Sequence, residues 1–194
     1  VDHVGNIGVV FGQRTQLWWD LPVIDSFELL RDIYKVPYSE YEKTKNELVE
    51  RLNLSDFINT PVRQLSLGQK MRCELAASLL HSPAILFLDE PTIGLDAVSK
   101  LAVRKFIKEL NQEKKTTVIL TTHDMDDIET LCSRVIVIGK GQILSDGSLN
   151  ELRKRVSKER RLIIELENNG FNLSIKGAYL VKWEGNRAFI NFDP

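Results

Sequence analysis

The sequence predicts an α/β domain built on a mainly parallel sheet, and three observations support this class. Between residues 84 and 146, short apolar runs alternate with helical patterns, as in strand–helix–strand units. Two of these runs, 84–88 and 135–138, are apolar at every position, as expected of strands covered on both faces. The 194 residues, of which 43% are hydrophobic, can bury one sizeable core and add a small second domain.

The predicted elements follow in order along the chain. A strand is expected at residues 4–13, then a mainly helical block at 24–82, where Tyr41 and Leu48 recur at helical spacing. The alternating region comprises strand 84–88, a helix with an apolar face of Val103, Phe106, Ile107 and Leu110, strand 117–120, a short helix and strand 135–138. A charged helix at 148–158 closes this domain.

We expect two domains, residues 1–158 and residues 159–194. The second begins where Leu162 and Ile164 alternate with charged residues, which predicts a small antiparallel sheet. Such a β-rich extension is either a regulatory or dimerising element or a passive addition that packs on the main domain. The sequence leaves both interpretations open.

Charge and hydropathy narrow the class of partner. Lys and Arg total 26 against 27 Asp and Glu, a net charge of −1, so no basic surface for nucleic acid is expected. The apolar stretches are far shorter than the roughly 20 residues that cross a bilayer. The two cysteines, Cys73 and Cys132, fit reduced thiols in a cytoplasmic protein. We therefore expect a membrane to be reached only through a partner.

Two adjacent carboxylates, Asp89 and Glu90, end the apolar run 85–88. Ligands collect at the carboxyl ends of parallel strands, and paired charges there are costly without a cation. Asp89 is placed to hold a magnesium ion, and Glu90 to orient or deprotonate an attacking water. The alternative is a solvated loop start, with Pro91 ending the pattern.

Four further motifs accompany this pair in a fixed order along the chain. The series comprises Gln13 after an apolar run, the signature Ser66-Leu67-Gly68-Gln69, the pair Asp89-Glu90, the loop Gly94-Leu95-Asp96, and Thr121-Thr122-His123. In order, spacing and context this series resembles the ATP-binding cassette (ABC) ATPase family over about residues 1–150. Within that family, the chain most resembles the ATPase subunits of ABC-2 type export systems.

The resemblance implies a P-loop NTPase fold of the ABC type, with the helical block 24–82 as its helical subdomain. It implies that ATP and Mg²⁺ are bound, and that ATP is hydrolysed by a dimer of two such subunits. It further implies transmembrane permease subunits as partners, at the cytoplasmic face of the cell membrane. Nucleic acid is not an expected partner.

The resemblance assigns roles to four residues around the γ-phosphate. Glu90 is the catalytic base, and His123 donates a hydrogen bond to the phosphate and helps to hold the water. Gln13 touches the magnesium ion and the water, and Asp89 is a metal ligand. If the other motifs of the family did not accompany it in their usual order, a lone histidine at this position would more often have a structural role.

The signature implies a phosphate contact in trans. Ser66, Gly68 and Gln69 would present a hydroxyl, backbone amides and a helix start to ATP on the opposing subunit. Leu67 stands where the family usually has glycine, so a positive φ there would be strained. Asp96 resembles the residue that crosses the dimer interface, and capping of the following helix is compatible with that role.

Two adjacent tryptophans, Trp18 and Trp19, lie in the region that resembles the permease-docking surface. Tryptophans in a loop are common interface anchors. The alternative is that one fills the core of the helical block. We expect one to be buried and the other to contribute to docking.

The phosphate-binding loop of the family, G-x-x-x-x-G-K-[ST], occurs nowhere in the sequence. Gly139-Lys140-Gly141-Gln142 is superficially similar, but it lies between two strands and reads as a hairpin turn. We therefore expect a fragment without its N-terminal strands that is inactive alone, so hydrolysis belongs to the full-length subunit.

Two other function classes remain open at this point. One is a soluble ABC-type ATPase acting on ribosomes or DNA. The near-neutral net charge and the pair Trp18 and Trp19 are evidence against this class. The other is a non-catalytic module, because the phosphate loop is absent. The transported substrate is not readable from the sequence.

Overall fold

The computed structural model describes residues 4–12, 14–156, 160–166 and 177–192. Contacts divide the chain into two compact units, Val1–Leu131 and Cys132–Pro194. This division falls earlier than the boundary after residue 158 that the sequence predicts, and that boundary lies outside the described residues.

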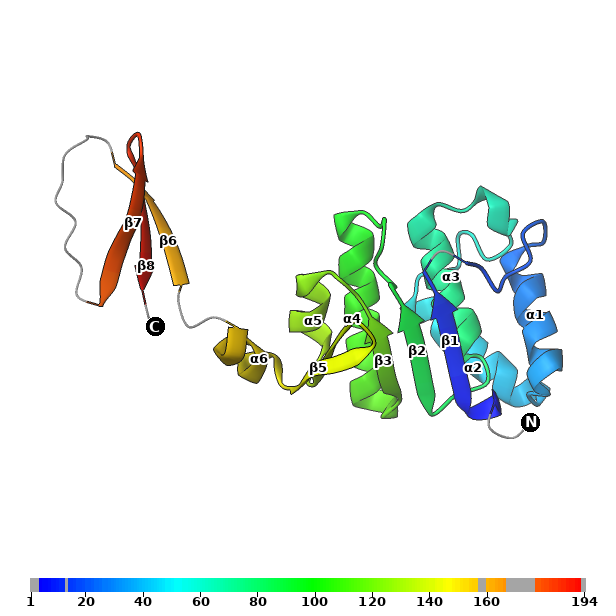
Figure 1. Cartoon of the computed structure of the whole chain (residues 1–194). Helices are drawn as coiled ribbons and strands as arrows, with labels where there is room; N and C mark the ends of the chain where they lie inside the picture. The colour runs from blue at the N-terminus through cyan, green and yellow to red at the C-terminus, as the bar shows by residue number, and fades with distance from the viewer. Residues whose placement is uncertain (1–3, 13, 157–159, 167–176, 193–194) are drawn as a thin grey trace. The chain divides into compact units, whose positions relative to one another are not determined.

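The first unit contains a three-stranded parallel sheet in the order β1–β2–β3 (Figure 1). Its strands are β1 (Ile7–Phe11), β2 (Ile85–Asp89) and β3 (Thr117–Thr121). The register aligns Phe11 with Asp89 and Asp89 with Thr121, so all three carboxyl ends lie at one edge. The parallel sheet confirms the predicted α/β class.

Helices lie between these strands as the sequence pattern predicts, and another follows the third strand, but a short 3-10 helix occupies residues 4–6, where the sequence predicts the start of the first strand. They are η1 (Val4–Asn6), α1 (Val23–Tyr34), α2 (Tyr38–Arg51), η2 (Val62–Gln64), α3 (Leu67–Leu79), α4 (Ala97–Lys114) and α5 (Met125–Leu131). Helices α1 to α3 form the predicted helical block. The apolar face predicted for α4 is confirmed, because Val103, Phe106, Ile107 and Leu110 are all buried.

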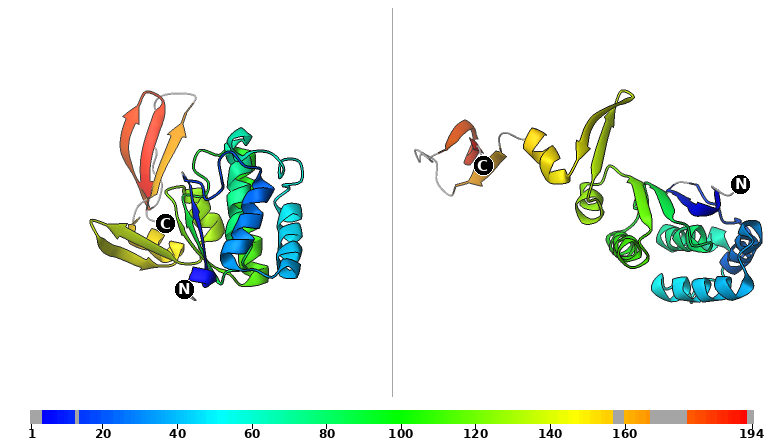
Figure 2. Two further views of the ribbon diagram at one scale, coloured as in Figure 1. Left: turned by 90° about the vertical axis from the view of Figure 1, so that its right-hand side faces the viewer. Right: turned by 90° about the horizontal axis from the view of Figure 1, so that it is seen from below.

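The sheet of the first unit is covered on one face only. Val10, Leu86 and Leu88 are buried in the core shared with α3 and α4, which lie on that face (Figure 2). On the other face, Phe87 and Ile119 are exposed. Coverage of both faces, expected from the apolar run 84–88, is therefore wrong for the described residues, because α3 and α4 both pack on the same side.

The second unit begins with a hairpin rather than with another parallel strand. Strands β4 (Val135–Gly139) and β5 (Gln142–Gly147) pair antiparallel. The turn residues Lys140 and Gly141 have φ of 50° and 74°, as a tight hairpin turn requires. The hairpin predicted here is confirmed, but the covered parallel strand predicted at 135–138 is wrong. The turn sends the chain straight back, and Ile138 is 71% exposed.

The rest of the second unit comprises one helix and a small sheet. Helix α6 spans Leu149–Val156. The strands β6 (Arg160–Glu165), β7 (Ala178–Glu184) and β8 (Arg187–Phe192) pair antiparallel in the order β6–β8–β7. Ala188 and Ile190 of the central strand β8 are buried. The antiparallel sheet predicted for this end of the chain is confirmed.

Candidate functional site

The carboxylate pair lies at the carboxyl edge of the sheet. The Asp89 Oδ1 atom accepts a 2.6 Å hydrogen bond from the Thr121 hydroxyl of the neighbouring strand β3. The backbone N–H of Gly12, just after β1, donates to the Asp89 carbonyl at 2.7 Å. A hollow of about 380 Å³ is lined by Phe11, Gly12, Arg14, Asp89 and Glu90. The ends of β1 and β2 thus open onto one hollow that is lined by two carboxylates.

His123 completes this edge by pairing with Glu90. Its Nδ1 atom lies 2.8 Å from Glu90 Oε1, although the two residues are 33 positions apart in sequence. The hydrogen bond to Glu90, reinforced by the negative charge of that carboxylate, raises the pKa of His123 above its ordinary value. The His123 side chain is 74% exposed, so the imidazole is accessible from solvent. An acid–base pair of this geometry can pass a proton to or from a bound oxygen.

Glu90 has a strained backbone. Its φ of 52° lies in the left-handed region, which costs a non-glycine residue of order 1–3 kcal/mol. Its N–H donates to both the carbonyl and the hydroxyl oxygen of Thr121, at 3.1 and 3.2 Å. The Ile93 N–H then closes a turn on the Glu90 carbonyl at 3.2 Å. Residues with such a backbone are found at functional sites, and here the Glu90 side chain contacts His123.

The residues expected to take part in magnesium binding can be compared with these positions. Carboxylate oxygens are the ligands that Mg²⁺ prefers, and Mg²⁺ usually takes only one or two from protein and the rest from phosphate and water. Asp89 fits that role, because its second oxygen is not used by Thr121. No group of three or more His, Cys, Asp or Glu suited to a metal occurs in the part of the chain that the structure describes. Gln13, the other expected ligand, lies outside the described residues.

The signature residues form a capped helix start. Ser66 is the N-cap of α3, where its hydroxyl accepts from the Gln69 N–H at 3.2 Å and Gln69 Oε1 accepts from the Ser66 N–H at 2.9 Å. Leu67 does not adopt a positive φ, so the strain considered for it is absent. A Cβ at Gly68 would lie 2.4 Å from the Ser99 hydroxyl, so glycine allows α3 and α4 to approach.

Asp96 caps the helix α4. Its carboxylate accepts from the Ser99 N–H at 3.0 Å and from the Ser99 hydroxyl at 2.6 Å. These hydrogen bonds lower the pKa of Asp96. Because Gly68 packs on Ser99, the signature helix and the Asp96 loop meet in the folded chain. The two motifs therefore form a second cluster, distinct from the Asp89, Glu90 and His123 edge.

The tryptophan loop departs from its expected arrangement. Trp18 and Trp19 are 38% and 54% exposed, so the expectation that one of them is buried is wrong. Leu17 is buried instead, at 4% exposure, and takes the core position. Lys70 lies 5.5 Å from the centre of the Trp19 ring. Both indoles thus belong to the surface of the first unit.

Sequence reasoning missed the residues that hold these loops in place. Asp127 lies in the first turn of α5, where an acidic side chain ordinarily complements the positive end of a helix. Its carboxylate is instead fully buried and bonded to Thr92, Thr122 and Arg104. The available signal was Arg104, a charged residue that directly follows Val103 on the buried face of α4. A cation at such a position requires a buried anion.

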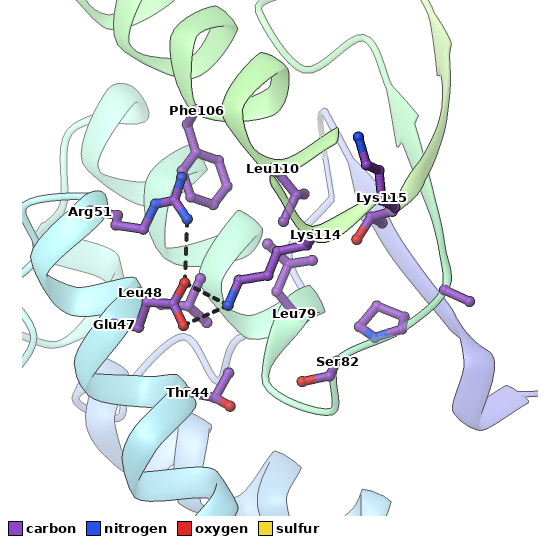
Figure 3. Close-up of a pocket in the computed structure, with 13 residues that line it drawn as sticks. Thr44, Glu47, Leu48, Arg51, Leu79, Ser82, Phe106, Leu110, Lys114 and Lys115 are labelled. Carbon is purple, nitrogen blue, oxygen red and sulfur yellow. Dashed lines mark hydrogen bonds and ion pairs between the residues drawn. The ribbon is translucent and has the colours of Figure 1, made fainter. Parts of the chain in front are cut away.

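A second hollow, of about 330 Å³, lies at the opposite, amino end of β2 and β3, beside Ala84 and Thr116 (Figure 3). Its charged groups bind one another: Glu47 accepts from Lys114 at 2.9 Å and from Arg51 at 3.3 Å. The second hollow therefore lies away from Asp89 and Glu90 and contributes nothing to their chemistry.

Comparison with known proteins is consistent with this geometry. Residues 2–93 match the family model described as ABC transporter. The chain is 32% identical over 146 residues to the ABC transporter ATP-binding protein NatA of Bacillus subtilis, covering 75% of this chain and 59% of NatA. It is 42% identical over 147 residues to the methionine import ATP-binding protein MetN 1 of Pseudomonas putida, covering 75% and 44%.

Solved structures agree. CbiO1 of Clostridium perfringens, part of the ABC transporter complex cbiONQ, superposes with a TM-score of 0.69 at 30% identity, covering 78% of this chain and 60% of CbiO1. The ATP-binding cassette MJ0796, in a post-hydrolysis dimer with ADP and Pi, superposes with a TM-score of 0.64 at 30% identity, covering 74% and 63%. The chain spans about half the length of the curated relatives it matches. The order of the motifs, the carboxylates at the sheet edge and these similarities agree. The chain therefore belongs to the ABC transporter family of ATP-binding proteins.

Proposed function

We propose that this chain belongs to a subunit that binds and hydrolyses ATP to drive transport through a separate membrane permease. The observation that carries the proposal is the 2.8 Å contact between His123 and Glu90 beside Asp89, at the carboxyl edge of a parallel sheet. Bound ATP with Mg²⁺ would supply the phosphate bond to be broken and the charge that polarises it. Since the sequence contains no phosphate-binding loop, the proposal concerns the whole subunit.

The chemistry assigned to the edge follows from the pairing. Glu90 accepts the proton of an attacking water, and a positioned base contributes about 100-fold or more to rate. When both ring nitrogens of His123 carry a proton, Nδ1 donates to Glu90 and Nε2 can donate to an oxygen of the γ-phosphate. The Thr121 hydroxyl donates to Asp89, which would hold the metal ion, and Gln13 would contact the metal and the water.

The signature helix is proposed to bind ATP of a second, identical subunit. A hydroxyl has one donor and two acceptor positions, so Ser66 can accept from Gln69 and still donate to a phosphate oxygen. The first backbone N–H groups of α3 lie at a helix start, where anions are stabilised, and Gly68 packs against Ser99 there. Asp96 caps α4 beside this helix and would lie at the dimer interface.

A permease is the proposed membrane partner, docking near Trp18 and Trp19. Their exposure supports this assignment, because aromatic side chains at a surface are typical interface anchors. No helix among the described residues is long and apolar enough to span a bilayer. We propose that the subunit lies at the cytoplasmic face of the membrane, bound through the permease.

The direction of transport stays a prediction. The relatives include a methionine import protein and a linearmycin resistance protein of Bacillus subtilis, so they do not favour the export type over import. All of these relatives are named as transporter or resistance ATP-binding proteins, which supports a transporter over an ATPase acting on ribosomes or DNA.

Substitution of Glu90 by Gln in the full-length subunit tests the proposal. Gln keeps the shape of the side chain but cannot accept the proton, so hydrolysis should fall at least about 100-fold. ATP binding should survive, and closed dimers should accumulate. Turnover within a few-fold of the unaltered protein would refute the role of Glu90, and loss of ATP binding would indicate a structural role instead.

A further inference from the structure

A single buried carboxylate joins three separate segments of the first unit. Asp127 lies in α5 with no exposed surface. Its Oδ2 atom accepts from the Thr92 hydroxyl at 2.6 Å and from the Thr122 hydroxyl at 3.0 Å. Its Oδ1 atom accepts from Arg104 Nε at 2.5 Å. Both carboxylate oxygens are therefore committed to side chains from outside their own helix.

The two hydroxyls belong to the loops that carry the catalytic pair. Thr92 lies two residues after Glu90, and Thr122 immediately precedes His123. Glu90 has a left-handed backbone, and strained residues persist only where surrounding contacts hold them. Thr92 is 1% exposed, so its hydroxyl has no water to replace Asp127.

Arg104 fixes the position of this carboxylate. A buried anion is costly unless a cation pairs with it, and the Arg104 side chain is only 9% exposed. The guanidinium also lies 3.2 Å from Asp124, which in turn pairs with Lys100 at 2.7 Å. Since Arg104 and Lys100 both lie on the long helix α4, Asp127 is attached to a rigid part of the core.

We propose that Asp127 is a positioning residue, which keeps Glu90 and His123 within hydrogen-bond distance by binding Thr92 and Thr122. The catalytic meaning of this contact rests on the proposed function. The contact itself exists without nucleotide and can be measured in the 194-residue chain.

The measurement is an NMR titration of the His123 imidazole, with a chelator present to remove metal ions. The charged groups that face this ring are Glu90, Asp124 and Lys100. In Glu90→Gln the pKa of His123 should fall, which defines the value for an unpaired ring. In Thr92→Val, which removes the hydroxyl without changing any charge, it should fall by at least half of that drop.

Two controls separate positioning from general effects. Ser78→Ala removes another buried hydroxyl, which bonds to the Leu75 carbonyl inside α3, and should leave the pKa of His123 unchanged. Asp127→Asn should lower that pKa more than Asp126→Asn does. Both substitutions remove one negative charge from α5, but Asp126 is exposed and holds neither loop.

If the pKa of His123 falls by less than half of that drop in folded Thr92→Val protein, the proposal is overturned. Should Asp127→Asn fail to fold, the Thr92→Val result is decisive. An unchanged His123 pKa in Glu90→Gln overturns it too, because the pair would then not exist in solution. Neither result depends on hydrolysis. Normal turnover of the full-length Glu90→Gln subunit would refute the catalytic role of Glu90 and leave the contact itself intact.

Discussion

Replacement of Gly12 by Ala should damage the carboxylate edge directly. A Cβ atom at this position would lie 2.6 Å from the Glu90 carbonyl oxygen and 2.7 Å from the Asp89 carbonyl oxygen. Both obstructing atoms are backbone, so no side chain can rotate away. The end of β1 must then move from β2, which strains the 2.7 Å hydrogen bond from the Gly12 N–H to the Asp89 carbonyl.

The cost follows from these two effects. Overpacking of a tight contact costs about 1–3 kcal/mol, and loss of one backbone hydrogen bond adds about 1 kcal/mol. We expect the free energy of unfolding of the first unit to fall by about 2–4 kcal/mol. Urea unfolding of the 194-residue chain, followed by circular dichroism and tryptophan fluorescence, measures this change.

Gly5→Ala is the matched control. A Cβ at Gly5 meets nothing within 4 Å, and neither glycine has a positive φ, so the two substitutions differ only in the space available. Gly5→Ala should change the unfolding free energy by less than about 0.5 kcal/mol. If Gly12→Ala proves as mild as this control, β1 and β2 do not approach as closely as described, and the edge geometry is wrong.

Three further substitutions or conditions test other parts of the site. Ser66→Ala removes the N-cap of α3 and should cost about 1 kcal/mol of stability in urea unfolding, with Ser66→Asp as the variant that restores it. Arg104→Met leaves Asp127 buried without its cation and should cost about 3–5 kcal/mol, so a midpoint near that of the unaltered chain would contradict the buried pair. Because pairing with Glu90 raises the pKa of His123 in the folded chain, this contact stabilises fully below the unfolded pKa of about 6.5 and is lost as pH rises through the folded pKa. The difference in unfolding midpoint between the chain and its Glu90→Gln variant should therefore shrink toward alkaline pH, and a difference that grows would show the opposite linkage.

Local pattern was sufficient for several parts of the molecule. The apolar face of α4 and the two glycines of the 139–142 turn depend on residues close in sequence, so periodicity and φ preference predict them. The signature depends on local sequence too: a serine followed three residues later by glutamine at the start of a helical pattern is typical of a capping box, and the structure has one here. The motif order was likewise readable, because each motif is a short run with its own chemistry.

Which strands pair with each other could not be predicted from local sequence. The run 135–138 is as apolar as 84–88, yet the first turns back into a hairpin and the second lies inside a parallel sheet. Apolar character states only that a strand can be buried, whereas the turn that follows determines which strand lies beside it. Leu17 rather than a tryptophan fills the core for a similar reason: the space left by α1 and α3 selects the side chain.

From its residues alone, the chain therefore specifies its α/β class, the apolar face of α4 and the hairpin turn at 139–142, since these depend on local composition and short motifs. The same motifs name the carboxylates and the histidine that we propose as the reacting groups. The contacts that join distant residues required the folded chain: Glu90 with His123, Asp89 with Thr121, and Asp127 with Thr92, Thr122 and Arg104. Each joins segments separated by a helix or a strand, or pairs a buried charge with a partner from another element. Such contacts depend on sheet register and on the cost of leaving a charge unpaired, and these are properties of the assembled core rather than of any single segment.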